Sequence, residues 1–299
     1  MDGIILLDKP AGMTSHDCVG KVRRLLKTKK VGHTGTLDPS VTGVLPICIG
    51  RATKLSQFLT AEVKEYLGEV TIGVSTTTED GDGEIVETSI PTESITAKMA
   101  EAALSQLLGT SQQTPPMYSA VKVNGKKLYE YARAGQSVER PSREITIFEA
   151  RLQGGVRKNE DGTYSFSFFV KGSKGLYVRT VATTLGEKLG YPAHMSHLRR
   201  TASGFFVIDD CLDFEQLQQA VTMGQVPLIS MNEALPAMPR VVVAAWEEKL
   251  VRNGVALTAS QIPQNPTGQF AIFNTSGEIL AVYERDATKN NYISVRGLC

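Results

Sequence analysis

The sequence predicts an α+β fold, with a mixed sheet in a large first domain and a small, mostly-β domain at the C-terminal end. Segments with strand and helix periodicity follow one another in irregular order, unlike the regular alternation of a doubly wound sheet. Two prolines close together in ALPAMPR mark a domain boundary. Short strands dominate the remainder of the chain. We therefore divide the chain into residues 1–237 and residues 238–299.

The large domain opens with a short apolar strand over residues 3–7. Thr14 can cap a helix whose apolar residues recur at helical spacing as far as Leu26, and a second helix is predicted over 52–59. Apolar and polar residues alternate over 66–74, which indicates a strand with one buried face. The polar segment TTTEDGDGE that follows is predicted to be a turn.

Three further helices are predicted where an amphipathic segment runs up to a glycine, over residues 99–108, 128–134 and 178–189. Strands are predicted over 145–152 and 164–170. In the small domain, one helix is predicted over 246–253. Three strands follow it, over 269–273, 279–283 and 292–295.

Composition narrows the class of protein only slightly. The 299 residues carry a net charge of +1, and the N-terminal segment has neither the basic region nor the long apolar run of a signal peptide. The four cysteines form no CxxC pair, which favours reduced thiols. We expect a cytoplasmic protein without a membrane span. Basic residues nevertheless cluster, above all in KVRRLLKTKK over residues 21–30. Several such segregated patches together suggest a polyanion-binding face. A solvated helix face is the alternative, and it is the more usual explanation for any one patch alone.

The segment GHTGTLDPSVTGVLP, residues 32–46, contains a single carboxylate, Asp38, among small and hydroxylic residues. Glycines there let a large ligand approach the backbone closely. Such a carboxylate can act as a nucleophile or in acid–base chemistry. The alternative is an aspartate that caps a turn, which is the usual role of an isolated Asp-Pro pair.

Six motifs in order decide between these alternatives: LLDKPAGMTS, GHTGTLDPSVTGVLP, KEY, PPMYSAVKVNGKKLYEYAR, KGLYVRT and SHLRRTASG. The chain resembles the TruB-type tRNA pseudouridine synthases, the enzymes of uridine 55 in the T-arm. The resemblance covers about residues 3–206, and the tail resembles the family's small PUA-like RNA-binding domain. One departure is Leu176 in KGLYVRT, where the family commonly has threonine.

The resemblance implies a catalytic set of Asp38, Tyr66 and Arg179. Asp38 matches the essential aspartate, and Arg179 matches the arginine that keeps it ionised and oriented. Tyr66 matches the tyrosine that stacks on the target base, although a plain core tyrosine is the alternative. The reaction detaches uracil and rejoins it through carbon without net redox change, so no cofactor is expected. Whether Asp38 adds to C1′ or removes the 2′ proton stays open.

The resemblance also implies the surroundings of the substrate. His33 matches the histidine that fills the space left when the uridine flips out of the tRNA. Tyr177 lines the uracil pocket and Leu198 forms an apolar wall. Lys9 belongs to a motif that packs beside the catalytic loop, and we expect its role to be structural.

Two other patterns point to metals but are weaker. His194 and His197 could form a metal pair without a nearby third ligand, and EDGDGE around Asp80 lacks the later ligands of a calcium loop. We expect no metal site. The partner expected is the tRNA T-arm, bound by a monomer without a guide RNA. The alternatives are the catalytic subunit of a guide-RNA-dependent particle and a non-catalytic RNA-folding protein.

Overall fold

Two paired strands near the N-terminus carry the loop that contains Asp38. In the computed structural model, which describes residues 1–60, 62–286 and 288–299, β1 (Gly3–Lys9) lies antiparallel to β3 (Thr42–Ile49). Both strands are apolar along nearly their whole length because both of their faces are covered. The loop between β2 (Val31–His33) and β3 therefore starts and ends in buried structure.

These strands belong to a nine-stranded sheet with the order β1-β3-β12-β4-β11-β10-β7, to which β2 and β13 (Phe206–Val207) are added beside β3 and β12. The other strands of this sheet are β4 (Lys64–Ile72), β7 (Gly109–Gln113), β10 (Arg143–Lys158), β11 (Tyr164–Gly172) and β12 (Ala193–Ser203).

All the pairings in this sheet are antiparallel except one. Strand β12 meets β3 in parallel over two residue pairs, Arg199 with Thr42 and Arg200 with Gly43. Gly43 has φ +105, and a Cβ there would lie 2.1 Å from the carbonyl oxygen of Arg200. Only glycine permits this contact, which joins the two halves of the sheet.

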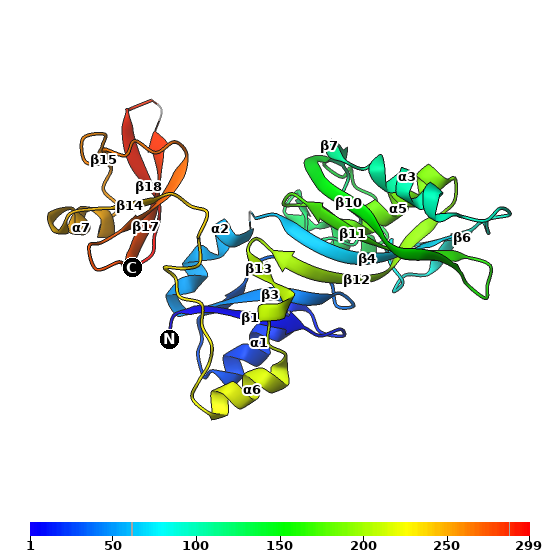
Figure 1. Cartoon of the computed structure of the whole chain (residues 1–299), viewed down its shortest axis with the longest axis horizontal. Coiled ribbons are helices and arrows are strands. Elements are labelled where there is room, and N and C mark those ends of the chain that lie inside the picture. The colour runs from blue at the N-terminus through cyan, green and yellow to red at the C-terminus, as the bar shows by residue number, and fades with distance from the viewer. Residues whose placement is uncertain (61, 287) are drawn as a thin grey trace.

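Helices cover the two halves separately (Figure 1). Helices α1 (Ser15–Leu25) and α6 (Phe214–Thr222) pack on the β1–β3 half, and α3 (Ala97–Ser105) and α5 (Val178–Leu189) pack on the β4–β11–β10 half. Thr14 caps α1 through the backbone amide of Asp17, as the sequence predicted. The helix predicted over 52–59 is a 3-10 turn, Gly50–Leu55, followed by α2 (Ser56–Thr60).

Two small hairpins and a short helix complete the large domain. The acidic segment TTTEDGDGE is the turn of a hairpin between β5 (Val74–Thr76) and β6 (Ile85–Thr88), as predicted. A second hairpin, β8 (Lys122–Val123) with β9 (Lys126–Lys127), leads into α4 (Leu128–Arg133). A 3-10 turn, Ile208–Asp210, precedes α6.

The tail forms its own five-stranded sheet in the order β14-β16-β17-β18-β15, with helix α7 (Ala245–Arg252) packed on it. Its strands are β14 (Arg240–Val242), β15 (Leu257–Thr258), β16 (Gln269–Phe273), β17 (Ile279–Asp286) and β18 (Asn291–Gly297). One face of this sheet shares an apolar core with the N-terminal strands: Phe273, Val282 and Leu298 pack in the same cluster as Ile4 and Leu6.

The α+β fold and the mostly-β tail predicted from the sequence are confirmed. The sequence analysis missed β12, which lies in the centre of the main sheet, and it missed α6 and β14. In the part of the chain that the structure describes, no helix is both long and apolar enough to cross a lipid bilayer.

Candidate active site

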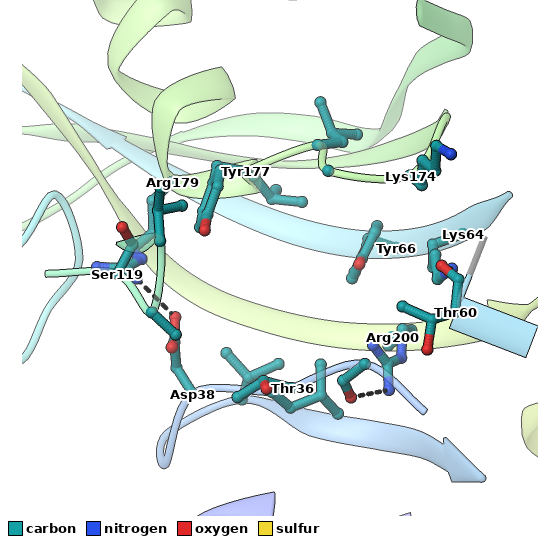
Figure 2. A pocket seen from close by; sticks show the side chains of 18 of the residues that line it. Thr36, Asp38, Thr60, Lys64, Tyr66, Ser119, Lys174, Tyr177, Arg179 and Arg200 are labelled. Carbon is teal, nitrogen blue, oxygen red and sulfur yellow. Dashed lines mark hydrogen bonds and ion pairs between the residues drawn. The ribbon is translucent and has the colours of Figure 1, made fainter. Parts of the chain in front are cut away.

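A cavity of about 740 Å³ lies where the two halves of the main sheet meet (Figure 2). The loop before β3 forms one side of it. Strands β4 and β12 form its floor, and the segments before β8 and α5 close the remaining sides. The lining residues used below are Gly35, Asp38, Lys64, Tyr66, Ser119, Lys174, Leu176, Tyr177, Arg179, Leu198 and Arg200.

Buried side chains hold the loop that carries Asp38. The Lys9 ammonium is fully buried and donates to the carbonyl oxygens of Pro10 at 2.8 Å, Pro39 at 3.0 Å and Val41 at 2.7 Å. All three of its N–H groups therefore have backbone acceptors. Lys9 thus lies behind the loop and is not among the residues that line the cavity.

A second anchor comes from helix α1. The Ser15 hydroxyl accepts from the backbone amide of Leu37 at 2.8 Å, and the backbone amide of Gly12 donates to Pro39 at 2.9 Å. These contacts satisfy backbone groups that have no strand partner in this loop. The position of the Asp38 carboxylate is consequently fixed by β1 and α1 together.

Arg179 lies in the first turn of α5 and is 4 % exposed. Its guanidinium is 2.9 Å from the Asp38 carboxylate, and it also donates to the carbonyl oxygens of Thr78 at 2.9 Å and Tyr118 at 2.8 Å. A second carboxylate, on Asp80, lies 3.5 Å from it. The arginine is thus held from three sides and presents one edge to Asp38.

Burial in the cavity raises the pKa of the Asp38 carboxyl above its usual value. The positive charge of Arg179 opposes this rise, whereas the negative charge of Asp80 adds to it. Because 41 % of the Asp38 side chain stays accessible, water screens part of these effects. The ion pair anticipated from the sequence is present, but it does not lower the pKa of Asp38 below its ordinary range.

Tyr66 and Leu198 form the floor of the cavity. Tyr66 is 8 % exposed on β4, and Leu198 is 8 % exposed on the neighbouring β12, where it pairs with Gly68. Figure 2 shows the Tyr66 ring pointing into the cavity between Arg179 at one end and Arg200 at the other. Tyr66 therefore belongs both to the apolar core and to the cavity wall.

Tyr177 lies immediately before α5 and its backbone is held by one side chain. Gln113 donates to the Tyr177 carbonyl oxygen at 3.1 Å and accepts from its amide at 2.8 Å. The guanidinium of Arg143 lies 5.1 Å from the centre of the Tyr177 ring. Leu176, the departure from the family motif, lines the same wall and leaves Tyr177 and Arg179 in the cavity.

His33 lies at the end of β2, outside the cavity lining that the described residues form. Burial lowers the pKa of its imidazole, and the charge of Arg200 lowers it further. Its Nδ1 atom is buried without a hydrogen-bond partner in the described part of the chain. The lowered pKa favours the neutral form of the ring at neutral pH.

The sequence analysis did not assign three charged residues to the site. Lys64 and Arg200 line the cavity, and Asp80 lies 3.5 Å from Arg179 without lining it. Lys64 and Tyr66 share one face of β4 because strand side chains alternate, so the KEY motif carried a usable signal. Arg200 carried no such signal, since an arginine that is 1 % exposed contradicts the ordinary burial preference.

The weaker metal patterns have other structural explanations. The Nδ1 atom of His194 lies 2.8 Å from the carbonyl oxygen of Val74, and Asp80 caps its own turn through the amide of Asp82 at 3.1 Å. Within the described residues, no group of three metal-ligating side chains comes together.

Comparison with known proteins identifies the family. Residues 23–178 match the model described as "TruB family pseudouridylate synthase (N terminal domain)", and residues 179–233 match "tRNA pseudouridylate synthase B C-terminal domain". The chain belongs to the TruB family and is thus a pseudouridine synthase, an isomerase. The second model ends before β14, so neither model covers the sheet of the tail.

Similar proteins cover almost the whole chain. It is 55 % identical over 286 residues to tRNA pseudouridine synthase B of Bacillus thuringiensis (strain Al Hakam), covering 95 % of this chain and 92 % of that protein. It is 53 % identical over 287 residues to tRNA pseudouridine synthase B of Bacillus subtilis (strain 168), covering 95 % and 93 %. A chain in the crystal structure of a Cbf5-Nop10-Gar1 complex superposes with a TM-score of 0.69 at 26 % identity, covering 95 % and 78 %.

Proposed function

We propose that the protein isomerises uridine 55 in the T-arm of tRNA to pseudouridine, acting alone and without a guide RNA. The observation that carries this proposal is the 2.9 Å contact between Arg179 and Asp38 in a cavity whose floor contains Tyr66. The tRNA substrate is supported by the two bacterial relatives, both of which are tRNA pseudouridine synthases.

In this proposal Asp38 acts on the ribose. The C1′–N1 bond breaks, uracil turns within the cavity, and C5 forms the new bond to C1′. An ionised carboxylate is required whether it adds to C1′ or removes the 2′ proton. Arg179 orients the carboxylate, and Tyr66 stacks on the uracil and takes part in proton transfer at C5.

The base must leave the folded tRNA to reach this cavity, at a cost of a few kcal/mol. His33, at the rim of the sheet, would fill the vacated position in the RNA, and its neutral ring suits stacking. Tyr177 and Leu198 would enclose the flipped uracil, and Lys9 would act only through the position of the catalytic loop. The domain division at residue 237 assigns the tail sheet to RNA contacts remote from this chemistry.

The test is conversion of an unmodified tRNA transcript by the purified protein in the absence of any other RNA or protein. Release of the hydrogen at C5 of the target uridine measures the complete reaction. We expect turnover on the transcript with uridine at position 55. We expect none on a transcript with cytidine at that position.

Two outcomes would contradict the proposal. Turnover that depends on an added guide RNA would identify the catalytic subunit of a guide-RNA-dependent particle. Tight tRNA binding without any conversion would identify an RNA-folding protein on the same scaffold. Conversion at another uridine would leave the enzyme class intact and correct the position.

A further inference from the structure

Two buried cations line the cavity without a carboxylate partner. Arg200 is 1 % exposed and Lys64 is 6 % exposed. Among the described residues, no carboxylate oxygen lies within the 4.0 Å of an ion pair from either side chain. Arg179, at the other end of the cavity, has two such carboxylates, on Asp38 and Asp80. Burying an unpaired charge is costly, so these cations need a different explanation from a structural ion pair.

The fold aims both cations at the same place. Arg200 on β12 lies directly opposite Tyr66 on β4 in the sheet register, and Lys64 is two residues before Tyr66 on the same face. Figure 2 shows Lys64 and Arg200 beside Tyr66, at the opposite end of the cavity from Asp38. The cations therefore lie on the far side of any base that stacks on Tyr66 while its ribose meets Asp38.

Both cations are held in place with donors to spare. Lys64 donates to the carbonyl oxygens of Thr60 at 2.7 Å and Glu62 at 2.5 Å, which leaves one of its three N–H groups. Arg200 donates to the carbonyl oxygens of Val44 at 2.7 Å and Gly35 at 3.4 Å, which leaves part of its five N–H groups. The backbone thus fixes the two heads without neutralising them.

We propose that Lys64 and Arg200 form an anion-binding pair that stabilises the uracil when it leaves the ribose as an anion. This inference rests on the proposed function. The C1′–N1 bond breaks and its electron pair stays on uracil, whose O2 and O4 atoms then share one negative charge. The same anion forms whether Asp38 adds to C1′ or removes the 2′ proton.

The later steps balance without another reactant. When C5 bonds to C1′, the electron pair of the uracil anion forms that bond. Asp38 is displaced from C1′ or returns the 2′ proton, according to the route. The proton at C5 then leaves and N1 gains one, so the product is an isomer of the substrate.

Because Lys64 and Arg200 are buried, their charges should stabilise the uracil anion effectively. Fixed charges in a water-poor site stabilise developing charge more strongly than exposed ones do, because they need no reorganisation. Lys174, which also lines the cavity, is exposed and offers a natural contrast. It supplies a solvated cation at the same cavity.

The experiment compares two bases in a minimal T-arm stem-loop, uridine and 5-fluorouridine at the target position. Fluorine withdraws electron density from the ring, so the 5-fluorouracil anion needs less stabilisation by the protein than the uracil anion does. Single-turnover cleavage of the N-glycosidic bond is measured for the wild type and for Lys64→Gln, which keeps hydrogen-bond donors and loses the charge. We expect a loss of about 10²–10³-fold with uridine. With 5-fluorouridine we expect the loss to be at least about tenfold smaller, because less of the anion's stabilisation then depends on the cation.

Lys64→Arg and Lys98→Met are the matched controls. Lys64→Arg keeps the charge and should retain most of the activity. Lys98→Met removes an exposed lysine on α3, outside the cavity lining, and should leave cleavage unchanged for both bases. Thermal unfolding establishes that each variant is folded. If Lys64→Gln does not fold, Arg200→Gln, which also loses the charge, gives the second test with the same two bases and the same expected difference. If the wild type fails to convert uridine, the proposed function is wrong. If the wild type is active and the loss in Lys64→Gln is the same for both bases, the anion-binding pair is wrong.

A pH profile gives an independent readout. The pKa of Lys64 is lowered to about 8, mainly by burial and also by the positive charges of Arg200 and Lys174, while the negative charge of Glu62 opposes this change. The protonated form is the active one, so cleavage should slow as pH rises through about 8. Lys64→Arg should abolish this decline, since arginine stays charged. A decline that persists unchanged in Lys64→Arg would overturn the assignment of Lys64.

Discussion

The ammonium of Lys9 lies 2.7 Å from the carbonyl oxygen of Val41, three residues beyond the Asp38 whose loop it supports. Lys9 is fully buried, and each of its three N–H groups is donated to a backbone carbonyl oxygen. This contact ties β1 to the loop before β3. It therefore links the stability of the fold to the geometry of the site.

Replacing Lys9 by methionine should lower the stability of the fold and disturb the geometry of the site. The three carbonyl oxygens would lose their donor, and each buried unsatisfied group costs about 1–3 kcal/mol. We expect a lower free energy of unfolding by urea denaturation and a lower single-turnover rate, because the loop no longer holds Asp38. Lys98→Met on the exposed surface of α3 is the control and should change neither. A Lys9→Met protein with wild-type stability would show that the loop holds itself.

Asp38→Asn should abolish turnover and leave tRNA binding within about tenfold of the wild type, because phosphate contacts supply most RNA affinity. The amide is nearly isosteric and can still meet Arg179, so the fold should be preserved. Rapid-quench kinetics and filter binding measure the two quantities. Turnover above roughly a few per cent of the wild-type rate would show that another group acts as the required nucleophile or base.

The acid limb of the rate profile should depend on Asp80. In the proposed function the carboxylate form of Asp38 is the active one. Its pKa is raised by burial and by the negative charge of Asp80, against the opposing effect of Arg179. Activity is therefore lost as pH falls through the raised pKa. Asp80→Asn removes one of the raising charges, so the limb should move to lower pH. Asp82→Asn, on the exposed side of the same turn, should leave the limb in place.

How far the sequence predicted this site varied with the residue. The range 178–189 for α5 agrees with the structure because periodicity and a glycine with φ +83 at residue 190 both define it locally. Strand β12 was missed because His194, Ser196 and His197 interrupt its apolar pattern, and its place is set by long-range pairing with β4 and β3. Position in a sheet is not a local property of the segment.

The charged residues of the cavity also differ in how far the sequence predicted their positions. The pairing of Asp38 with Arg179 was anticipated only through the family resemblance, since nothing in either segment shows that β3 and α5 come together. Arg200 is buried against the carbonyl oxygens of Val44 and Gly35, which belong to a distant part of the chain. Its neighbour Arg199 pairs with Asp8 on the other side of the sheet. The LRR motif alone does not show which arginine lies inside.

The structure narrows down which lysines and arginines of the basic segment 21–30 are free to contact RNA. Arg23 donates to the Val31 carbonyl oxygen and Lys21 lies over the Phe214 ring, so these two are structural. Lys27, Lys29 and Lys30 are exposed after the end of α1.

Neutralising these three lysines together with glutamine should weaken tRNA binding. The slope of log K against log salt should flatten by about one unit per lost phosphate contact. Filter binding over a range of salt concentrations measures both effects. The same change at Lys98 and Lys188, exposed on α3 and α5, is the control. An unchanged slope would make the run ordinary solvated surface.

Removing the tail after Ala237 tests the proposed domain division and should separate stability from chemistry. Every residue that lines the cavity near Asp38 precedes the tail, so single-turnover conversion of a T-arm stem-loop should stay close to that of the full chain. The tail nevertheless shares a core with Ile4 and Leu6, and its removal exposes their apolar surface. At about 25 cal/mol per Å² of apolar area returned to water, exposing even a small part of that interface should lower the melting temperature measurably.

Whole tRNA should bind more weakly to the shortened protein, since remote contacts supply affinity rather than rate acceleration. Calorimetry establishes whether the shortened protein is folded at the assay temperature. If a folded shortened protein no longer converts the stem-loop, the tail takes part in the chemistry and the division at residue 237 is wrong.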